Sequence, residues 1–411
     1  MTKKNLIVGQ SGGPTAVINS SLYGVVSEGI AHSDEIGEVY GMVNGIEGFL
    51  EDRILNFREA LPGEQLDYLK HTPGAYLGSC RYKLPESLED PVYPLLFEKF
   101  EEMNIGWFFY IGGNDSMDTV SKLSRYAAQT GSSIRVIGEP KTIDNDLVHT
   151  DHTPGYGSAA KYIGTSVKEI IRDSFCLEYG KGLVSIVEIM GRNAGWLTGA
   201  AALAKGEDCL GPDLIYLPEL PFDIEAFSEK VKDLLAKKPS VVVAVSEGIR
   251  LADGRYVCEL GQSVDFVDAF GHKQLSGTAN YLASYIAGEF GCKTRAIELS
   301  TLQRSASHCA SRVDILEAYQ VGGAAVKAAD EGDSGKMVVL QRLSDDPYQC
   351  GTEVKDVHKI ANDEKVVPRE WVTEDGSYVT DDFVSYVRPL IQGDVSPVMV
   401  DGIPRHLYRK N

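Results

Sequence analysis

Two carboxylates in residues 140–146 (PKTIDND) have a spacing suited to proton transfer. In an extended backbone, residues two apart face the same side, so Asp144 and Asp146 would point into one pocket. One could take a proton from an attacking hydroxyl while the other orders a metal ion or the base. Thr142 adds a hydroxyl, and Lys141 adds a cation that suits phosphate. The pattern indicates phosphoryl transfer; the alternative is a solvated turn rich in aspartate and asparagine.

Two glycine-rich turns that follow other apolar runs could bind a phosphate donor. Gly12 and Gly13 lie in QSGGP, where backbone N–H groups can approach a phosphate closely. Gly113, Asn114 and Asp115 lie in GGNDS, where the two polar side chains offer oxygens that suit Mg²⁺. Each turn has a simpler alternative, a tight strand-to-helix connection or a capped helix start. Neither contains GxxxxGK[ST], so a Walker-type ATPase is not indicated.

Charged side chains at three further places could hold a phosphorylated sugar. Arg192, in MGRNAGW, follows an apolar run and could clamp a phosphate or stabilise developing charge. Glu247, in SEG, ends another run and could bind sugar hydroxyls. Arg295 and Arg304 together suit a phosphate monoester. For each of these, an ordinary exposed side chain is the alternative.

Alternating strands and helices must position these groups. The predicted strands are rich in β-branched and aromatic residues and span residues 5–9, 107–111, 135–138, 184–187, 214–217, 241–245 and 337–340. The predicted helices span residues 95–102, 116–129, 159–173, 223–237 and 278–289. Such alternation predicts an α/β fold with parallel sheets, in which ligands bind at the carboxyl ends of strands.

Composition excludes several classes of partner. The chain has 411 residues and a net charge of −19, so attraction to nucleic acid or an anionic membrane is not expected. Seven cysteines without a CxxC pair favour reduced thiols and a cytoplasmic location. No apolar run approaches the length of a membrane span. The length predicts two or three domains.

Taken in order, these segments resemble the phosphofructokinase family. The resemblance runs from the SGG turn through GGNDS, PKTIDND, MGR and SEG to TRAIELSTLQRS, and it covers most of the chain. The motifs TIDND and MGR together are highly specific for this family. The later stretch VPREWVTEDGSYVTDDFVSYVRPLIQG is similar to the pyrophosphate-dependent branch. The family fold that this implies has two similar α/β domains with largely parallel sheets and the active site in the interdomain cleft. The phosphoryl-donor domain would comprise residues 1–152 with 303–360, and the fructose-phosphate domain residues 153–302 with 361–411.

The resemblance also implies a role for each matching residue. Asp144 corresponds to the base that takes the proton of the sugar C1 hydroxyl, while Lys141 and Arg192 would stabilise charge during transfer. The implied substrate-binding residues are Thr142, Asp146, Met190, Gly191, Arg192, Glu247, Arg295 and Arg304. The implied donor-binding residues are Gly12, Gly13, Arg81, Gly113, Asn114, Asp115 and Lys141.

Two positions distinguish the phosphoryl donor. ATP-dependent members have GGDGS and PGTIDND, whereas this chain has Asp115 and Lys141 in place of the two variable glycines. The Asp115 side chain would fill the room needed by a nucleotide α-phosphate, and Lys141 would pair with pyrophosphate. Asn114 replaces the family's metal-side aspartate, so the metal ligands would be Asp115 and Asn114. The resemblance thus implies Mg²⁺-dependent, reversible transfer from pyrophosphate to fructose 6-phosphate in glycolysis and gluconeogenesis, giving fructose 1,6-bisphosphate and phosphate.

Two other functions remain open at this point. An ATP-dependent 6-phosphofructokinase is disfavoured by Asp115 and Lys141. A non-catalytic, regulatory sugar-phosphate-binding homologue would be expected to lose the catalytic carboxylate, yet Asp144 and Asp146 are both present. We expect a cytoplasmic homodimer or homotetramer whose small-molecule partners are fructose 6-phosphate and pyrophosphate.

Overall fold

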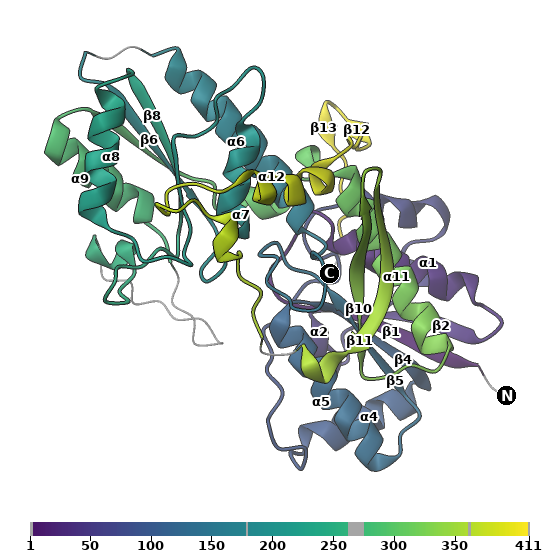
Figure 1. Cartoon of the computed structure of the whole chain (residues 1–411). Helices are drawn as coiled ribbons and strands as arrows, with labels where there is room; N and C mark the ends of the chain where they lie inside the picture. Colours follow the sequence, from purple (N-terminus) through teal and green to yellow (C-terminus); the bar gives the residue numbers. More distant parts are fainter. Residues whose placement is uncertain (1–2, 178–179, 262–274, 361–362, 410–411) are drawn as a thin grey trace.

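Two β-sheets, each in its own lobe, form the framework of the protein (Figure 1). The structure is a computed structural model that describes residues 3–177, 180–261, 275–360 and 363–409. The first sheet has the strand order β11-β10-β5-β4-β1-β2-β3, and the second has the order β7-β8-β6-β9. A small hairpin of β12 (Met399–Val400) and β13 (Ile403–Pro404) lies near the C-terminus.

The elements have the following bounds. The first sheet contains β1 (Lys4–Gln10), β2 (Ile36–Met42), β3 (Ile54–Asn56), β4 (Ile105–Gly112), β5 (Arg135–Pro140), β10 (Lys336–Asp345) and β11 (Tyr348–Asp356). The second contains β6 (Leu183–Ile189), β7 (Leu214–Tyr216), β8 (Ser240–Ser246) and β9 (Lys293–Glu298). The α-helices are α1 (Ile18–Ala31), α2 (Gly45–Leu50), α3 (Phe57–Ala60), α4 (Val92–Glu102), α5 (Asn114–Thr130), α6 (Tyr156–Phe175), α7 (Trp196–Gly199), α8 (Ile224–Leu235), α9 (Thr278–Phe290), α10 (Leu302–Ser305), α11 (Arg312–Asp330) and α12 (Asp381–Val387).

Parallel pairing brings the functional loops together. In the first sheet β1 pairs in parallel with β2 and β4, and β5 pairs in parallel with β4 and β10. The strands of the second sheet are all parallel. Because the carboxyl ends of parallel strands meet at one edge of a sheet, the loops after β1, β4 and β5 gather at one edge, and those after β6 and β8 gather at another.

Helices cover both faces of each sheet, so the central strands are buried on both sides. Helices α4 and α5 pack on one face of the first sheet, and α1 and α11 pack on the other. In the second lobe, α8 and α9 pack on one face, whereas α6, α7 and α12 share a core on the other. This explains the continuous apolar runs of strands such as β8, where Val241 and Val243 pack in one core and Val242 and Ala244 in the other.

The predicted α/β class is confirmed, as are all seven predicted strands and all five predicted helices. Four of the strands that were not predicted, β2, β3, β9 and β11, are short or polar and lie in or beside the edges of the sheets. For example, β11 has the sequence YQCGTEVKD, and only one face of this edge strand needs apolar residues. Within the described residues, no helix is both long enough and apolar enough to cross a bilayer.

Helices α1 and α11 approach each other closely through glycines. A Cβ atom at Gly24 of α1 would lie 2.3 Å from the carbonyl oxygen of Tyr319, and one at Gly322 of α11 would lie 2.2 Å from that of Ser21. By contrast, a Cβ atom at the neighbouring Gly323 would lie 3.6 Å from a Glu28 carboxylate oxygen, which is an ordinary contact. The close contact between the helices therefore depends on Gly24 and Gly322.

We predict that Gly322→Ala lowers the free energy of unfolding by about 1–3 kcal/mol, because the added methyl group must push the helices apart. The matched variant Gly323→Ala should be neutral or stabilising by up to about 1 kcal/mol, since alanine favours the helix. Denaturant titration of both variants measures the difference. Equal effects of the two substitutions would contradict the packing account.

Candidate active site

A cavity of about 660 Å³ lies between the loop clusters of the two sheets. Loops after β1, β4 and β5 line it from the first lobe, and loops after β6 and β8 line it from the second. Of the residues predicted for the site, all except Arg295 line this cavity: Gly12, Gly13, Arg81, Gly113, Asn114, Asp115, Lys141, Thr142, Asp144, Asp146, Met190, Gly191, Arg192, Glu247 and Arg304.

The loop that carries the two carboxylates is bent, so the predicted extended backbone is wrong. Asn145 has a left-handed conformation with φ of 54°, and the Asp144 N–H donates to Thr142 Oγ1 at 3.0 Å. The Asn145 side chain is buried and donates to Tyr386 Oη at 3.0 Å, while Asp144 and Asp146 line the cavity. The two carboxylates thus share the cavity because of a turn held by side chains, and not because of strand alternation.

Burial raises the pKa values of both carboxylates. Burial raises the pKa of Asp144, against the opposing effects of Lys141 and Thr142. Burial and the neighbouring Asp144 raise the pKa of Asp146 to about 7. A carboxylate with a raised pKa is a stronger base than an exposed one, which suits proton abstraction near neutral pH.

Lys141 connects this loop to the first glycine turn. Its ammonium group donates to the Gly13 carbonyl oxygen at 2.6 Å, and a Cβ atom at Gly12, where φ is 76°, would lie 3.3 Å from Nζ. Burial lowers the pKa of Lys141 to about 8, although Asp144 and Asp146 oppose the fall. The turn therefore holds a buried cation beside the two carboxylates.

In the second lobe, the ends of β6 and β8 hold Arg192 and Glu247 together. Gly191, with φ of 139°, donates its N–H to Glu247 Oε1 at 3.4 Å, and its carbonyl oxygen accepts a hydrogen bond from Ser246. A Cβ atom at Gly248 would lie 2.0 Å from the Arg192 carbonyl oxygen, so glycine is required there. Burial raises the pKa of Glu247 to about 7.

Two arginines give the cavity a positive side that suits phosphate. Arg304 lies in α10, and burial together with the nearby Arg81 lowers its pKa. A Cβ atom at Gly13 would lie 3.6 Å from Arg304 Nη1, so this arginine faces the first glycine turn. Arg304 is thus placed where it can reach an anion between the two loop clusters.

Arg295 does not line the cavity of its own chain, so its predicted role in phosphate binding stays a prediction. It lies in the middle of β9, where its side chain forms an ion pair with Asp173 of α6. Strand alternation directs this side chain toward the helix that covers the sheet. Within one chain, the two arginines therefore do not meet in the cavity.

Oxygen ligands at the cavity fit the predicted magnesium ion. Asp115 lies in the first turn of α5 and lines the cavity, and the adjacent Asn114 donates its Nδ2 group to the Asp363 carbonyl oxygen at 2.9 Å. Asp146 Oδ1 is buried with no hydrogen-bond partner among the described residues. Such carboxylate and amide oxygens are the ligands that Mg²⁺ prefers.

Sequence reasoning missed Asp363 and Glu364, which also line the cavity. Glu364 accepts a hydrogen bond from Asn193 Nδ2 at 3.1 Å. In the part of the chain that the structure describes, no apolar strand leads directly into these residues, so the pattern that revealed the other loops does not apply to them. The stretch that is similar to the pyrophosphate-dependent branch begins at Val367, after both acids.

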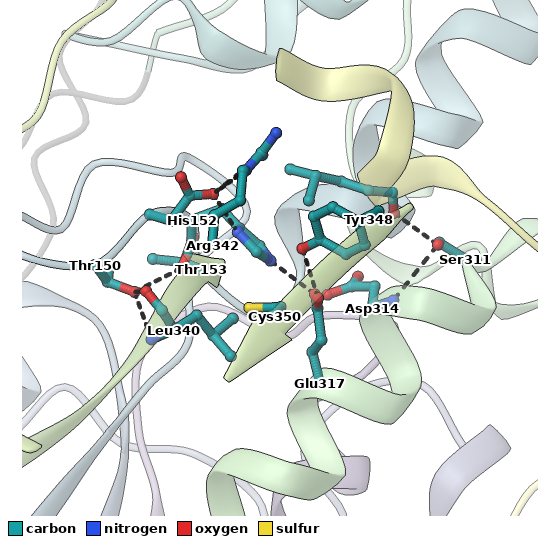
Figure 2. Close-up of polar contacts among 12 residues, drawn as sticks. Thr150, His152, Thr153, Ser311, Asp314, Glu317, Leu340, Arg342, Tyr348 and Cys350 are labelled. Atoms are coloured by element: carbon teal, nitrogen blue, oxygen red, sulfur yellow. Dashed lines mark hydrogen bonds and ion pairs between the residues drawn. The ribbon is translucent and has the colours of Figure 1, made fainter. Parts of the chain in front are cut away.

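A buried ionic network surrounds His152, which follows the carboxylate loop in the sequence (Figure 2). His152 makes hydrogen bonds with Asp151 at 2.8 Å and with Glu317 of α11 at 2.7 Å, and Tyr348 donates to Glu317 at 2.6 Å. Although burial opposes it, the carboxylate of Glu317, with that of Asp151, raises the pKa of His152 to about 9. Cys350 lies close enough to His152 and Glu317 for the three to hold a metal ion, but both ring nitrogens of His152 already make hydrogen bonds. The bond to Glu317 links His152 to α11.

Comparison with known proteins agrees with this geometry. The model of the phosphofructokinase family matches residues 5–329. A pyrophosphate–fructose 6-phosphate 1-phosphotransferase of Halomonas elongata is 41% identical over 408 residues, which cover 98% of this chain and 96% of that protein.

Two crystal structures are similar over nearly the whole chain. A pyrophosphate-dependent phosphofructokinase from Nitrosospira multiformis has a TM-score of 0.89 and 36% identity, covering 99% of this chain and 96% of that one. Another, from Marinobacter aquaeolei, has a TM-score of 0.87 and 38% identity, covering 99% and 98%. On these matches and the shared fold, the chain belongs to the phosphofructokinase family.

Proposed function

We propose that the protein transfers a phosphoryl group from pyrophosphate to the C1 hydroxyl of fructose 6-phosphate, giving fructose 1,6-bisphosphate and phosphate. The observation that carries this proposal is the convergence of Asp144, Lys141 and Arg192 on one cavity, with Asp115 beside them. Full-length relatives named for the same reaction support it. The reaction is reversible, because a pyrophosphate anhydride and a sugar phosphate ester differ less in energy than ATP and the ester.

The two loop clusters have different tasks in this proposal. The first lobe, with Lys141 and the glycine turns, holds pyrophosphate, and the second lobe, with Arg192 and Glu247, holds the sugar phosphate. We propose the domain limits predicted from the family, residues 1–152 with 303–360 and residues 153–302 with 361–411. The predicted homo-oligomer and cytoplasmic location belong to the same proposal.

Proton removal and charge stabilisation come from this chain's own residues. Asp144 takes the proton from the C1 hydroxyl as its oxygen attacks the terminal phosphorus, and the raised pKa of Asp144 favours this transfer. Lys141 and Arg192 stabilise the charge on the transferred group. Mg²⁺, when bound by Asp115 and Asn114, would neutralise pyrophosphate charge. Thr142 holds the carboxylate loop in place through its bond to the Asp144 N–H.

We predict that Asp144→Ser lowers kcat with pyrophosphate by roughly two to four orders of magnitude, because the base is removed. Steady-state assays measure the change in kcat. Calorimetry should still detect binding of fructose 6-phosphate to the variant. Asp208→Ser, which removes a carboxylate paired with Lys168 away from the cavity, serves as a control. Unchanged turnover of the Asp144 variant would exclude this base. Wild-type protein that binds fructose 6-phosphate without turnover would instead support a non-catalytic homologue.

The double variant Lys141→Gly with Asp115→Gly tests the choice of donor. It removes a buried cation and opens space at the start of α5, so we predict a higher KM for pyrophosphate and a gain of turnover with ATP. The KM for fructose 6-phosphate, measured in the same assays, should change little because Arg192 and Glu247 are intact. Pyrophosphate kinetics equal to those of the wild type would refute the assignment of these residues to the donor.

A further inference from the structure

Residues 363–367, which we call the strap, run between the two lobes beside the cavity (Figure 1). The strap lies outside residues 5–329, the part of the chain that the family model matches. It nevertheless contacts loops of both lobes. The Asp363 carbonyl oxygen accepts a hydrogen bond from Asn114 of the first lobe at 2.9 Å, and the Glu364 carboxylate accepts one from Asn193 of the second at 3.1 Å.

Lys365 connects the strap to the carboxylate loop by its backbone and its side chain. Its N–H donates to the Asp146 carbonyl oxygen at 2.7 Å. Its ammonium group donates to the carbonyl oxygens of Asp151 at 2.6 Å and Thr150 at 3.3 Å, and to Asn145 Oδ1 at 3.2 Å. One side chain thus spans the loop that begins directly after Asp144.

The opposite side of the strap is fixed to the second lobe. Trp196 donates its indole N–H to the Lys365 carbonyl oxygen at 2.8 Å, and the Lys365 ammonium lies 5.2 Å from the centre of that indole ring. Further along, the Val367 N–H donates to Glu219 Oε1 at 3.0 Å, and the same oxygen accepts from the Gly195 N–H at 2.7 Å. Lys365 therefore lies where the carboxylate loop meets the loop after β6.

The oxygens at this contact suit a cationic donor. Three oxygens surround the Lys365 ammonium, and two of them are backbone carbonyl oxygens that a neutral apolar side chain would leave without this donor. Although burial lowers the pKa of Lys365 to about 8, the carboxylates of Asp151 and Asp146 favour the charged form. An error of even 1 Å in the position of a reacting group can lower the rate by roughly 100-fold, so a support this close to Asp144 matters for the reaction.

We propose that Lys365 is a positioning residue for phosphoryl transfer, which holds residues 145–151 and thereby sets the place of Asp144 and Asp146 in the cavity. This rests on the proposed function. Lys365 does not line the cavity. It acts through the loop, so its loss should affect the rate of the chemical step more than the binding of either substrate.

The test compares Lys365→Met, Lys365→Arg and Lys161→Met in the full chain. Lys161 of α6 is a matched control, because its ammonium also donates to two backbone carbonyl oxygens, those of Ala310 and Gly393, but away from the cavity. Steady-state assays give kcat and both KM values, and thermal melting gives Tm. If Lys365→Met does not fold, Lys365→Gln replaces it under the same criteria.

We expect Lys365→Met to lower kcat by roughly 10- to 100-fold while both KM values stay within about threefold. Lys365→Arg should recover part of this loss, because it keeps the charge and the donors. Lys161→Met should keep kcat near the wild-type value, even where its Tm falls equally. The proposal is overturned if Lys365→Met keeps kcat within about twofold of the wild type, or loses no more than Lys161→Met. Wild-type turnover with ATP alone would contradict the proposed donor, and the Lys365 comparison would then be made with ATP.

Discussion

The burial of opposite charges within one loop is the constraint on which the site depends. Lys141, Asp144 and Asp146 lie largely away from water, and desolvation opposes the charged form of each. Buried ions persist only where charge and hydrogen bonds compensate for lost hydration. The Gly13 carbonyl oxygen and the Thr142 hydroxyl supply part of that compensation. A bound polyanion would supply more for the lysine, so the site is suited to a phosphate donor.

The parts of the fold that could be predicted from the sequence are those that are most completely buried. Central strands such as β4 and β8 are buried on both faces, so their sequences are continuous apolar runs. Edge strands such as β9 carry no such run, because part of their surface stays exposed. The helices α1 and α11 were missed because glycines at their contact weaken the helical signal, although those glycines allow the close approach.

The site could be predicted where reactive or charged residues directly follow an apolar strand. Residue types and the resemblance located the carboxylate loop, both glycine turns and Arg192, but not the conformation that joins them. Asn145 makes the bend, and its partner Tyr386 lies 241 residues away, beyond the reach of any local pattern. The same limitation applies to Arg295, whose environment is set by Asp173 of another element, and to Lys365. Tertiary contacts of this kind decide where a side chain acts.

The central claim is that this site uses pyrophosphate, and a donor comparison with the wild-type protein tests it most directly. Formation of fructose 1,6-bisphosphate would be measured with fructose 6-phosphate, Mg²⁺ and either pyrophosphate or ATP at equal concentration. The account predicts rapid turnover with pyrophosphate and little with ATP, because Asp115 and Lys141 occupy the donor side of the cavity. Faster turnover with ATP than with pyrophosphate would contradict it.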